Sequence, residues 1–172
     1  MYVYFIRWAT WKAFEQVERG PAIVALITPS AWLTGPGFMG LREHLRRHAD
    51  TMYVLDLGGD NRGADPDSNV FPIQTPVAIT VAVRNAESRV QTPAEIFYSR
   101  IHGSRSQKLE ALARVPFSAT AWVTIEANWR EGFVPATGSA SWQTYPLLSD
   151  LFPWQQPGAL LSRTWPVAPH PS

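Results

Sequence analysis

Residues Asp56–Val81, "DLGGDNRGADPDSNVFPIQTPVAITV", join two apolar segments through a long polar loop. The segment before the loop is "TMYVLDL" (Thr51–Leu57), and the segment after it is "VAITVAV" (Val77–Val83), which is rich in β-branched residues. No helical pattern separates these predicted strands, and a parallel crossover usually needs a helix. We therefore expect the two strands to be antiparallel. A long irregular loop in a packed domain is usually functional or disordered, so this loop is a candidate functional site.

The residues before this stretch predict a layered α/β fold. "AIVALIT" (Ala22–Thr28) is a continuous apolar run after the turn signal Gly20-Pro21, which is typical of a strand buried on both faces in a parallel sheet covered by helices. Periodic apolar residues predict helices over Tyr2–Glu18 and Phe38–His48. Helices that alternate with apolar strands indicate an α/β sheet, of which three strands and two helices make half of a doubly wound one. We therefore expect the chain to be a fragment of a larger protein.

The spacing of apolar residues predicts which helix faces are buried. The residues expected to face inward are Tyr2, Phe5, Ile6, Ala9, Ala13 and Val17 in the first helix and Met39, Leu41 and Leu45 in the second, with the arginines outward. After Asn85, "AEIFYSRIHG" can form a strand, and a third helix is expected over Ser104–Arg114, with apolar Leu109, Leu112 and Ala113. Two basic groups (Arg42, Arg46, Arg47 and His48; Arg100, His102, Arg105 and Lys108) are interpreted as solvated faces, with a nucleic-acid patch as the alternative.

Composition excludes several classes of protein. Of the 172 residues, 45% are hydrophobic and 17% charged, as in globular proteins, and the formal net charge of +1 neither favours nor excludes a nucleic-acid partner. The absence of cysteine excludes disulfides, thiolate metal sites and thiol nucleophiles. No long apolar run predicts a membrane span and no leader is recognisable, so we expect no membrane association and a cytoplasmic location. The 15 prolines and 8 tryptophans are concentrated after residue 115, which predicts an irregular C-terminal segment.

Several motifs match known sites only superficially. "GPGFMG" (Gly35–Gly40) has dinucleotide-binding spacing, but "PSAWLT" separates it from the preceding strand, whereas that fingerprint needs its first glycine directly after the strand. A calcium loop starting at Asp65 lacks the glycine at its sixth position and the glutamate at its twelfth. No context for nucleophilic catalysis is present. We expect none of the four histidines, which include His48, His102 and His170, to form an i, i+4 metal-ligand pair, and we expect each at the surface.

The order of short motifs over residues 1–85 resembles a known family. "ITPS", "GPGF", "LREHL", "DLGG" and "VFPIQT" follow one another as in the C-terminal half of the catalytic domain of adenine-specific N6 DNA methyltransferases, closest to single-polypeptide (type ISP-like) restriction-modification enzymes. The resemblance implies a partial doubly wound, Rossmann-like methyltransferase sheet with a terminal antiparallel strand pair, in which Val77–Val83 lies between the other two strands. Residues 86–172 resemble more loosely a connector toward the target-recognition region.

The resemblance also implies a reaction and its partners. The family transfers a methyl group from S-adenosylmethionine to adenine N6, on a base turned out of the duplex. The family's cofactor-binding glycine loop and its N-P-P-Y tetrapeptide occur nowhere in these 172 residues. We therefore expect no catalytic or cofactor-binding residue, no bound metal, no S-adenosylmethionine binding and no activity in this chain alone. The expected partners are DNA and the missing N-terminal half of the methyltransferase domain.

The same resemblance assigns candidate contacts to the target base. Phe71 of "VFPIQT" falls where an aromatic side chain can support the flipped adenine, and Gln74 falls where a polar group can point at the base or its phosphate. Arg62, Arg105 and Lys108 are possible DNA contacts. A core aromatic at the entrance of a strand is the alternative for Phe71. The alternative function is a non-enzymatic module that binds a protein partner through its Trp- and Pro-rich tail.

Overall fold

The computed structural model describes residues 2–17, 20–60, 67–85, 92–126, 128–136, 145–146 and 151. The chain divides into two compact units, Met1–Pro135 and Ala136–Ser172. Because only 136, 145–146 and 151 are described in the second unit, the irregular C-terminal segment stays a prediction. No helix in the described part of the chain has the length and hydrophobicity needed to cross a membrane.

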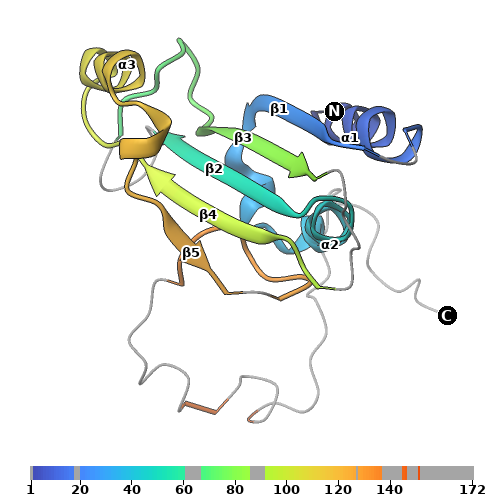
Figure 1. Cartoon of the computed structure of the whole chain (residues 1–172). Helices are drawn as coiled ribbons and strands as arrows, with labels where there is room; N and C mark the ends of the chain where they lie inside the picture. The colour runs from blue at the N-terminus through green and yellow to red at the C-terminus, as the bar shows by residue number, and fades with distance from the viewer. Residues whose placement is uncertain are drawn as a thin grey trace, which may run out of the picture. The chain divides into compact units, whose positions relative to one another are not determined.

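The first unit is built on a five-stranded mixed sheet with the order β1-β3-β2-β4-β5 (Figure 1). The strands are β1 (Ala22–Pro29), β2 (Thr51–Gly58), β3 (Val77–Arg84), β4 (Glu95–Arg100) and β5 (Val123–Ile125). β3 lies between β1 and β2 and is antiparallel to both, which confirms the predicted strand order. β4 is parallel to β2, and β5 is antiparallel to β4, so the sheet extends past residue 85. This architecture is compatible with a Rossmann-like fold.

Two helices cover one face of the sheet. α1 (Tyr2–Thr10), which continues into the π-helix η1 (Trp11–Glu15), and α2 (Met39–His48) pack there through Ile6, Phe14 and Leu45. The sheet contributes Val24, Met52, Val54, Ala78, Ala82 and Ile96 to this core. The 3₁₀ turns η2 (Ser30–Leu33) and η3 (Pro36–Phe38) lead into α2, and they place Trp32 and Leu33 in the core.

The first helix differs from its prediction in both length and buried face. The helix was predicted to end at Glu18, a residue outside the described part of the chain. In the structure, α1 ends at Thr10 and the helical segment η1 that follows it ends at Glu15. Phe5 and Val17 were expected to be inside, but they are 63% and 50% exposed. The buried residues of this segment are Ile6, Thr10 and Phe14, spaced four apart. The π turn changes the helical period only from Trp11 onward, so it accounts for the position of Val17 and not for that of Phe5.

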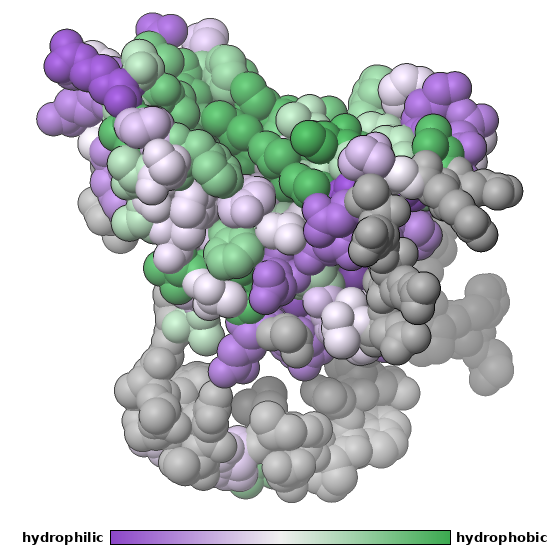
Figure 2. All heavy atoms as spheres, in the orientation of Figure 1, coloured by the Kyte–Doolittle hydropathy of each residue, from purple (hydrophilic) through white to green (hydrophobic). Residues whose placement is uncertain are grey.

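The predicted burial of β1 on both faces is wrong for this chain. Ile23 is 66% exposed and Ile27 is 55% exposed, whereas Val24 and Thr28 on the opposite face are buried. α3 (Arg105–Arg114) and the residues after it lie beside β2, β3 and β4 on the second face, and the hollow that they line includes no residue of β1. Figure 2 shows hydrophobic side chains gathered on the surface between α3 and α1.

The expectation that the arginines of α2 face solvent is confirmed for Arg47, whose side chain is 51% exposed, but is wrong for Arg42 and Arg46. Arg42 is 3% exposed and Arg46 is fully buried, whereas Met39, expected inside, is 45% exposed. The Arg42 guanidinium donates to the carbonyls of Trp32 and Gly35, both at 2.8 Å. Arg46 donates to the Gly132 carbonyl at 3.3 Å, and its guanidinium carbon lies 4.8 Å from the centre of the Phe133 ring. Carbonyl groups accept hydrogen bonds from both cations, which offsets the cost of burying them, although Arg46 Nε has no partner.

A third buried arginine closes the end of the first helix. Arg84, the last residue of β3, donates to the carbonyls of Gly20 and Val17 at 3.1 and 2.8 Å and also to the carbonyl of Phe14. Carbonyl groups at a helix C-terminus have no partner within the helix and attract cations. Arg84 therefore ties the end of η1 to β3.

The "DLGG" motif ends β2 with a turn that needs glycine. Gly58 has φ +60° and Gly59 has φ +102°, in the left-handed region that side chains disfavour. A Cβ atom on Gly58 would collide with the Asp67 carboxylate and lie 3.1 Å from the Arg100 guanidinium. The backbone can therefore approach Asp67 closely only because residue 58 has no side chain.

We expect Gly58→Ala to lower the free energy of unfolding by at least about 1–2 kcal/mol, because it adds left-handed strain and a clash with Asp67. Urea unfolding followed by circular dichroism measures this loss. Gly40→Ala is the control, since nothing lies within 4 Å of a Cβ there; in the first turn of α2 it should be neutral or stabilising by up to about 1 kcal/mol. Equal effects at the two positions would contradict this account of the turn.

Candidate functional site

The carboxyl ends of β2 and β4 carry a connected group of polar side chains. Asp56 of β2 accepts a hydrogen bond from the Tyr98 hydroxyl at 2.8 Å and one from the Gly58 amide at 2.8 Å. Arg100 lies 3.6 Å from the Asp56 carboxylate and 3.4 Å from that of Asp67. Burial raises the pKa of Tyr98, and the adjacent Asp56 charge raises it further, so this phenol remains protonated. The group fixes the end of the sheet from which the polar loop departs.

Lys108 of α3 anchors the returning end of that loop. Its ammonium group is fully buried and donates to the carbonyls of Leu57 and Ser68, both at 2.7 Å, and to Asp67 at 2.6 Å. An ammonium group has three donors, so these contacts occupy all of them. The predicted phosphate contact of Lys108 is therefore inconsistent with its burial. The residue joins β2, the loop and α3 instead.

The Asp67 carboxylate is held in its charged form. Burial acts to raise its pKa, but hydrogen bonds from Lys108 and the Gly59 amide, together with the charges of Lys108 and Arg100, outweigh burial and lower the pKa below the usual 3.8. A lowered pKa in the folded state means that the stabilisation is present at neutral pH. This stabilisation starts to fall when the pH drops below 3.8, the usual pKa of the group, and it is lost once the pH has dropped below the lower pKa of the folded state.

Asn69 gives the segment before β3 its shape. It is 7% exposed, and its amide nitrogen donates to the Thr75 carbonyl at 2.8 Å while its amide oxygen accepts from the Phe71 N–H at 3.0 Å. These two bonds close residues 70–75 into a compact turn that projects Phe71 and Gln74 outward. An asparagine that bonds the backbone two residues ahead is a common turn former, so sequence reasoning could have assigned Asn69 this role.

Three of the predicted contact residues line one open hollow of about 390 Å³, called here the Phe71 hollow. Its walls are Ser68, Asn69, Phe71, Pro72, Ile73, Gln74 and Arg105. Phe71 is 41% exposed, which excludes the alternative that it is a core residue. Arg105 donates from Nε to the Val70 carbonyl at 2.9 Å, which holds its guanidinium beside the turn. Arg62 lies outside the described residues.

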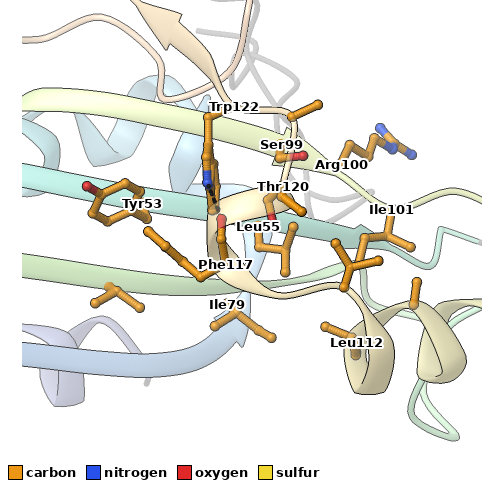
Figure 3. Close-up of a pocket in the computed structure, with 15 residues that line it drawn as sticks. Tyr53, Leu55, Ile79, Ser99, Arg100, Ile101, Leu112, Phe117, Thr120 and Trp122 are labelled. Atoms are coloured by element: carbon orange, nitrogen blue, oxygen red, sulfur yellow. Dashed lines mark hydrogen bonds between the residues drawn. The ribbon is translucent and has the colours of Figure 1, made fainter.

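A second, mostly apolar hollow of about 400 Å³ lies on the sheet face that α1 and α2 leave uncovered (Figure 3). Tyr53 and Leu55 form its floor, and Leu112 and Trp122 belong to its walls. The Tyr53 ring packs edge-on against Phe117 and Trp122, with ring centres 4.7 and 5.3 Å apart. This second hollow lies on the same sheet face as Ile23 and Ile27, the exposed apolar residues of β1.

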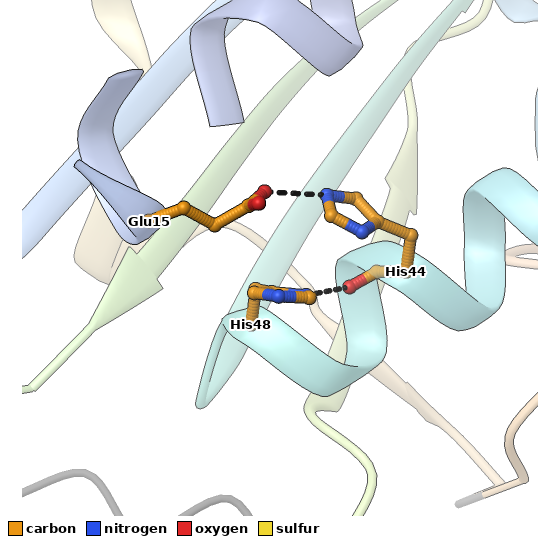
Figure 4. Close-up of side chains that lie close together, drawn as sticks. All are labelled: Glu15, His44 and His48. Carbon is orange, nitrogen blue, oxygen red and sulfur yellow. Dashed lines mark hydrogen bonds and ion pairs between the residues drawn. The ribbon is translucent and has the colours of Figure 1, made fainter. Parts of the chain in front are cut away.

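The expectation for the histidines is wrong at one place. His44 and His48 stand at i, i+4 on α2, and Glu15 of η1 lies against them (Figure 4). The sequence signal for this pair is "HLRRH" (His44–His48), which places two histidines four residues apart on one helix face. His102 is exposed as expected, and His170 lies outside the described residues.

The fold of this chain is also found in restriction-modification enzymes of known structure. The ATP-dependent Type ISP restriction-modification enzyme LlaBIII, bound to DNA, matches 76% of this chain with 24% identity and a TM-score of 0.63. A nuclease-deletion mutant of the Type ISP restriction-modification enzyme LlaGI, in complex with a DNA substrate mimic, matches 84% with 20% identity and a TM-score of 0.68. A DrdV–DNA complex matches 78% with 25% identity and a TM-score of 0.64.

This similarity concerns a small part of each neighbour. The chain spans 13% of DrdV, 9% of LlaBIII and 12% of LlaGI. No protein-family model and no curated protein sequence matches the chain. The comparisons therefore establish which fold the chain shares.

We expect Lys108→Met to lower the free energy of unfolding by about 3 kcal/mol, because it leaves the Asp67 carboxylate without its closest cation. Chemical denaturation at neutral pH measures the loss. Lys12→Met is the matched control, since Lys12 is exposed, and it should change stability by less than about 0.5 kcal/mol. If Lys108→Met unfolds like the parent chain, the ammonium group is accessible and the predicted DNA contact regains support.

Proposed function

We propose that this chain is the C-terminal half of the catalytic domain of a DNA adenine-N6 methyltransferase that uses S-adenosylmethionine and belongs to a restriction-modification system. The observation that carries the proposal is the antiparallel β3 between β1 and β2, which is the strand order implied by the resemblance to that family. The shared fold with DNA-bound Type ISP enzymes supports a DNA-binding, restriction-modification role. Alone, the chain is inactive.

The Phe71 hollow supports a role in holding the target adenine. In open α/β sheets, ligands bind outside the carboxyl ends of the strands, and the hollow lies against the loop that leaves β2 at that end. The exposed Phe71 ring offers a face on which a base can stack, and Gln74 offers both a donor and an acceptor. Arg105 supplies a cation suited to a DNA phosphate near the flipped base.

The surface around β1 supports the proposed N-terminal half as a partner. Among the strands that the structure describes, β1 pairs only with β3, so its other edge has no strand beside it. Exposed apolar side chains flank this edge in both layers: Tyr4, Phe5 and Trp8 on α1, and Ile23 and Ile27 on β1. Natural sheets normally protect an edge, and large apolar patches mark interfaces. A further strand with its helix, added beside β1, buries this surface.

The gene tests the proposal directly. The reading frame upstream of the Met1 codon is expected to encode a glycine-rich cofactor loop and an N-P-P-Y or D-P-P-Y tetrapeptide. A stop codon and a ribosome-binding site directly before Met1, with no separate gene for the other half, would oppose the proposal.

In the complete enzyme, we expect Phe71→Ala to slow methylation about 10–100-fold, because base–aromatic stacking contributes roughly 1–3 kcal/mol per base. Transfer of a labelled methyl group to duplex DNA measures the rate. The defect should shrink when the target adenine faces a mismatch, since less unpairing energy is then needed.

Phe117→Ala is the matched control for Phe71→Ala, because Phe117 is another exposed phenylalanine, 57% accessible, in the second hollow. It should leave the methylation rate within about twofold of the parent enzyme. A Phe71→Ala enzyme that unfolds at a much lower temperature, but methylates normally in its folded fraction, would make Phe71 a structural residue.

We expect this chain alone to bind S-adenosylmethionine weakly or not at all, because the cofactor loop is absent from its sequence. Calorimetric titration gives the affinity, and low-micromolar binding would refute the half-domain proposal. Co-expression with the upstream half should restore binding. Ile27→Asp at the open edge should reduce this recovery, whereas Val123→Asp on β5, 52% exposed at the other edge, should not.

A further inference from the structure

A group of metal-ligand side chains lies near the amino end of β2, away from the Phe71 hollow. Glu15 of η1 faces His44 and His48 of α2 (Figure 4). One ligand atom from each residue lies within 4.8 Å of the other two. We propose that these three residues bind Zn²⁺, or a transition-metal ion of similar preference, and that the ion joins the first helical segment to α2.

The local structure explains why the three side chains meet. Residues four apart on an α-helix project from the same face, so His44 and His48 lie one above the other, with ring centres 4.2 Å apart. Glu15 is the last residue of the π-helix, and π turns are frequent at functional sites. The hydroxyl of Thr10, which is fully buried, donates to the carbonyls of Ile6 and Arg7, so in the absence of a metal ion it accepts a hydrogen bond from His44 Nε2 at 3.2 Å; the ion replaces this contact when Nε2 binds it.

The separation of two of the ligand atoms suits a small tetrahedral ion, and the third ligand atom lies within 4.8 Å of both. His44 Nε2 and Glu15 Oε1 are 3.6 Å apart, and ligands bonded to zinc at about 2.0–2.2 Å are separated by about 3.4 Å in tetrahedral geometry. His48 Nδ1 lies 2.8 Å from the His44 carbonyl oxygen. It therefore donates a proton there and leaves Nε2 free as a ligand. This outer hydrogen bond from a ligand histidine to a backbone carbonyl is a regular feature of zinc sites.

Arg7 is the main competitor of the ion. Its guanidinium donates to Glu15 Oε1 at 2.6 Å and to Oε2 at 3.1 Å. A carboxylate has about four lone-pair positions, so it can bind a metal ion through one oxygen and keep Arg7 on the other. Two imidazoles and one carboxylate favour Zn²⁺ over Mg²⁺ or Ca²⁺, which prefer oxygen ligands. The fourth position is left for water.

The ion acts on structure rather than on methyl transfer. The site lies where α2 leads into β2, whereas the Phe71 hollow adjoins the other end of this 8-residue strand, about 25 Å along it. Because the ion binds the folded arrangement of η1 and α2, it stabilises that arrangement by linkage. The inference is independent of the proposed methyltransferase function.

Calorimetric titration of the untagged 172-residue chain with ZnCl₂ tests the site. One ion per chain is expected, with no comparable binding of Mg²⁺ or Ca²⁺. Saturating Zn²⁺, at about a hundredfold excess over Kd, should raise the melting temperature by roughly 5–10 °C, and a chelator should reverse the rise. His44→Gln and His48→Gln should each weaken Zn²⁺ binding by at least tenfold, because mutating a residue that only hydrogen-bonds to a metal ligand already lowers metal affinity about 10–100-fold.

His102→Gln is the control, because His102 is exposed on a different segment, and it should bind Zn²⁺ like the parent chain. Circular dichroism without metal confirms that each variant is folded; His48→Gln is the more informative of the pair because it spares the contact between His44 and Thr10. Absence of Zn²⁺ binding by the parent chain would overturn the proposal. The proposal would also be overturned if a folded His44→Gln/His48→Gln double variant bound Zn²⁺ as tightly as the parent chain. It would be overturned as well if His102→Gln lost as much Zn²⁺ affinity as the site variants.

Discussion

β3 pairs with β1 on one side and with β2 on the other, antiparallel to both, and every other part of the first unit is placed relative to these three strands. The pairing satisfies backbone groups of all three strands and leaves one face for α1 and α2. It also requires the chain to reverse direction between Gly58 and Val77. The polar loop is the direct consequence of that reversal, and it brings the Phe71 hollow to the carboxyl end of β2.

Buried cations convert this sheet into a connected structure. Arg42 and Arg46 hold distant loop carbonyls against α2, Arg84 closes the end of η1, and Lys108 joins α3 to the loop. Carbonyl oxygens or a carboxylate accept hydrogen bonds from each cation, although Arg46 Nε has no partner. None of the four is therefore available as a point of contact for a phosphate group, which leaves Arg105 as the described basic residue beside the Phe71 hollow.

The two ends of β2 have different chemistry. At the carboxyl end, an exposed aromatic ring, an amide and a guanidinium surround an open hollow suited to a planar base. Near the amino end, Glu15, His44 and His48 form a compact donor set suited to a metal ion that clamps two helical segments. The open edge of β1, with apolar surface in both layers, adds a third region, which fits the continuation of the sheet.

The sequence by itself predicted β1, β2 and β3, the antiparallel pairing of β3 with its neighbours, and the place of Phe71 at the end of a long loop, because apolar runs, the missing crossover helix and the motif order are local properties of the chain. It did not predict the short strand β5, whose segment has little apolar periodicity. It did not determine which charged side chains are buried. Arg46 and Lys108 carry the same local signal as solvated residues, and their carbonyl partners lie 86 and 51 positions away. Likewise, "HLRRH" lies in the sequence, but only the packing of η1 against α2 brings Glu15 to it. The tertiary structure decided these features because a buried cation or a ligand cluster depends on contacts between segments far apart in the chain.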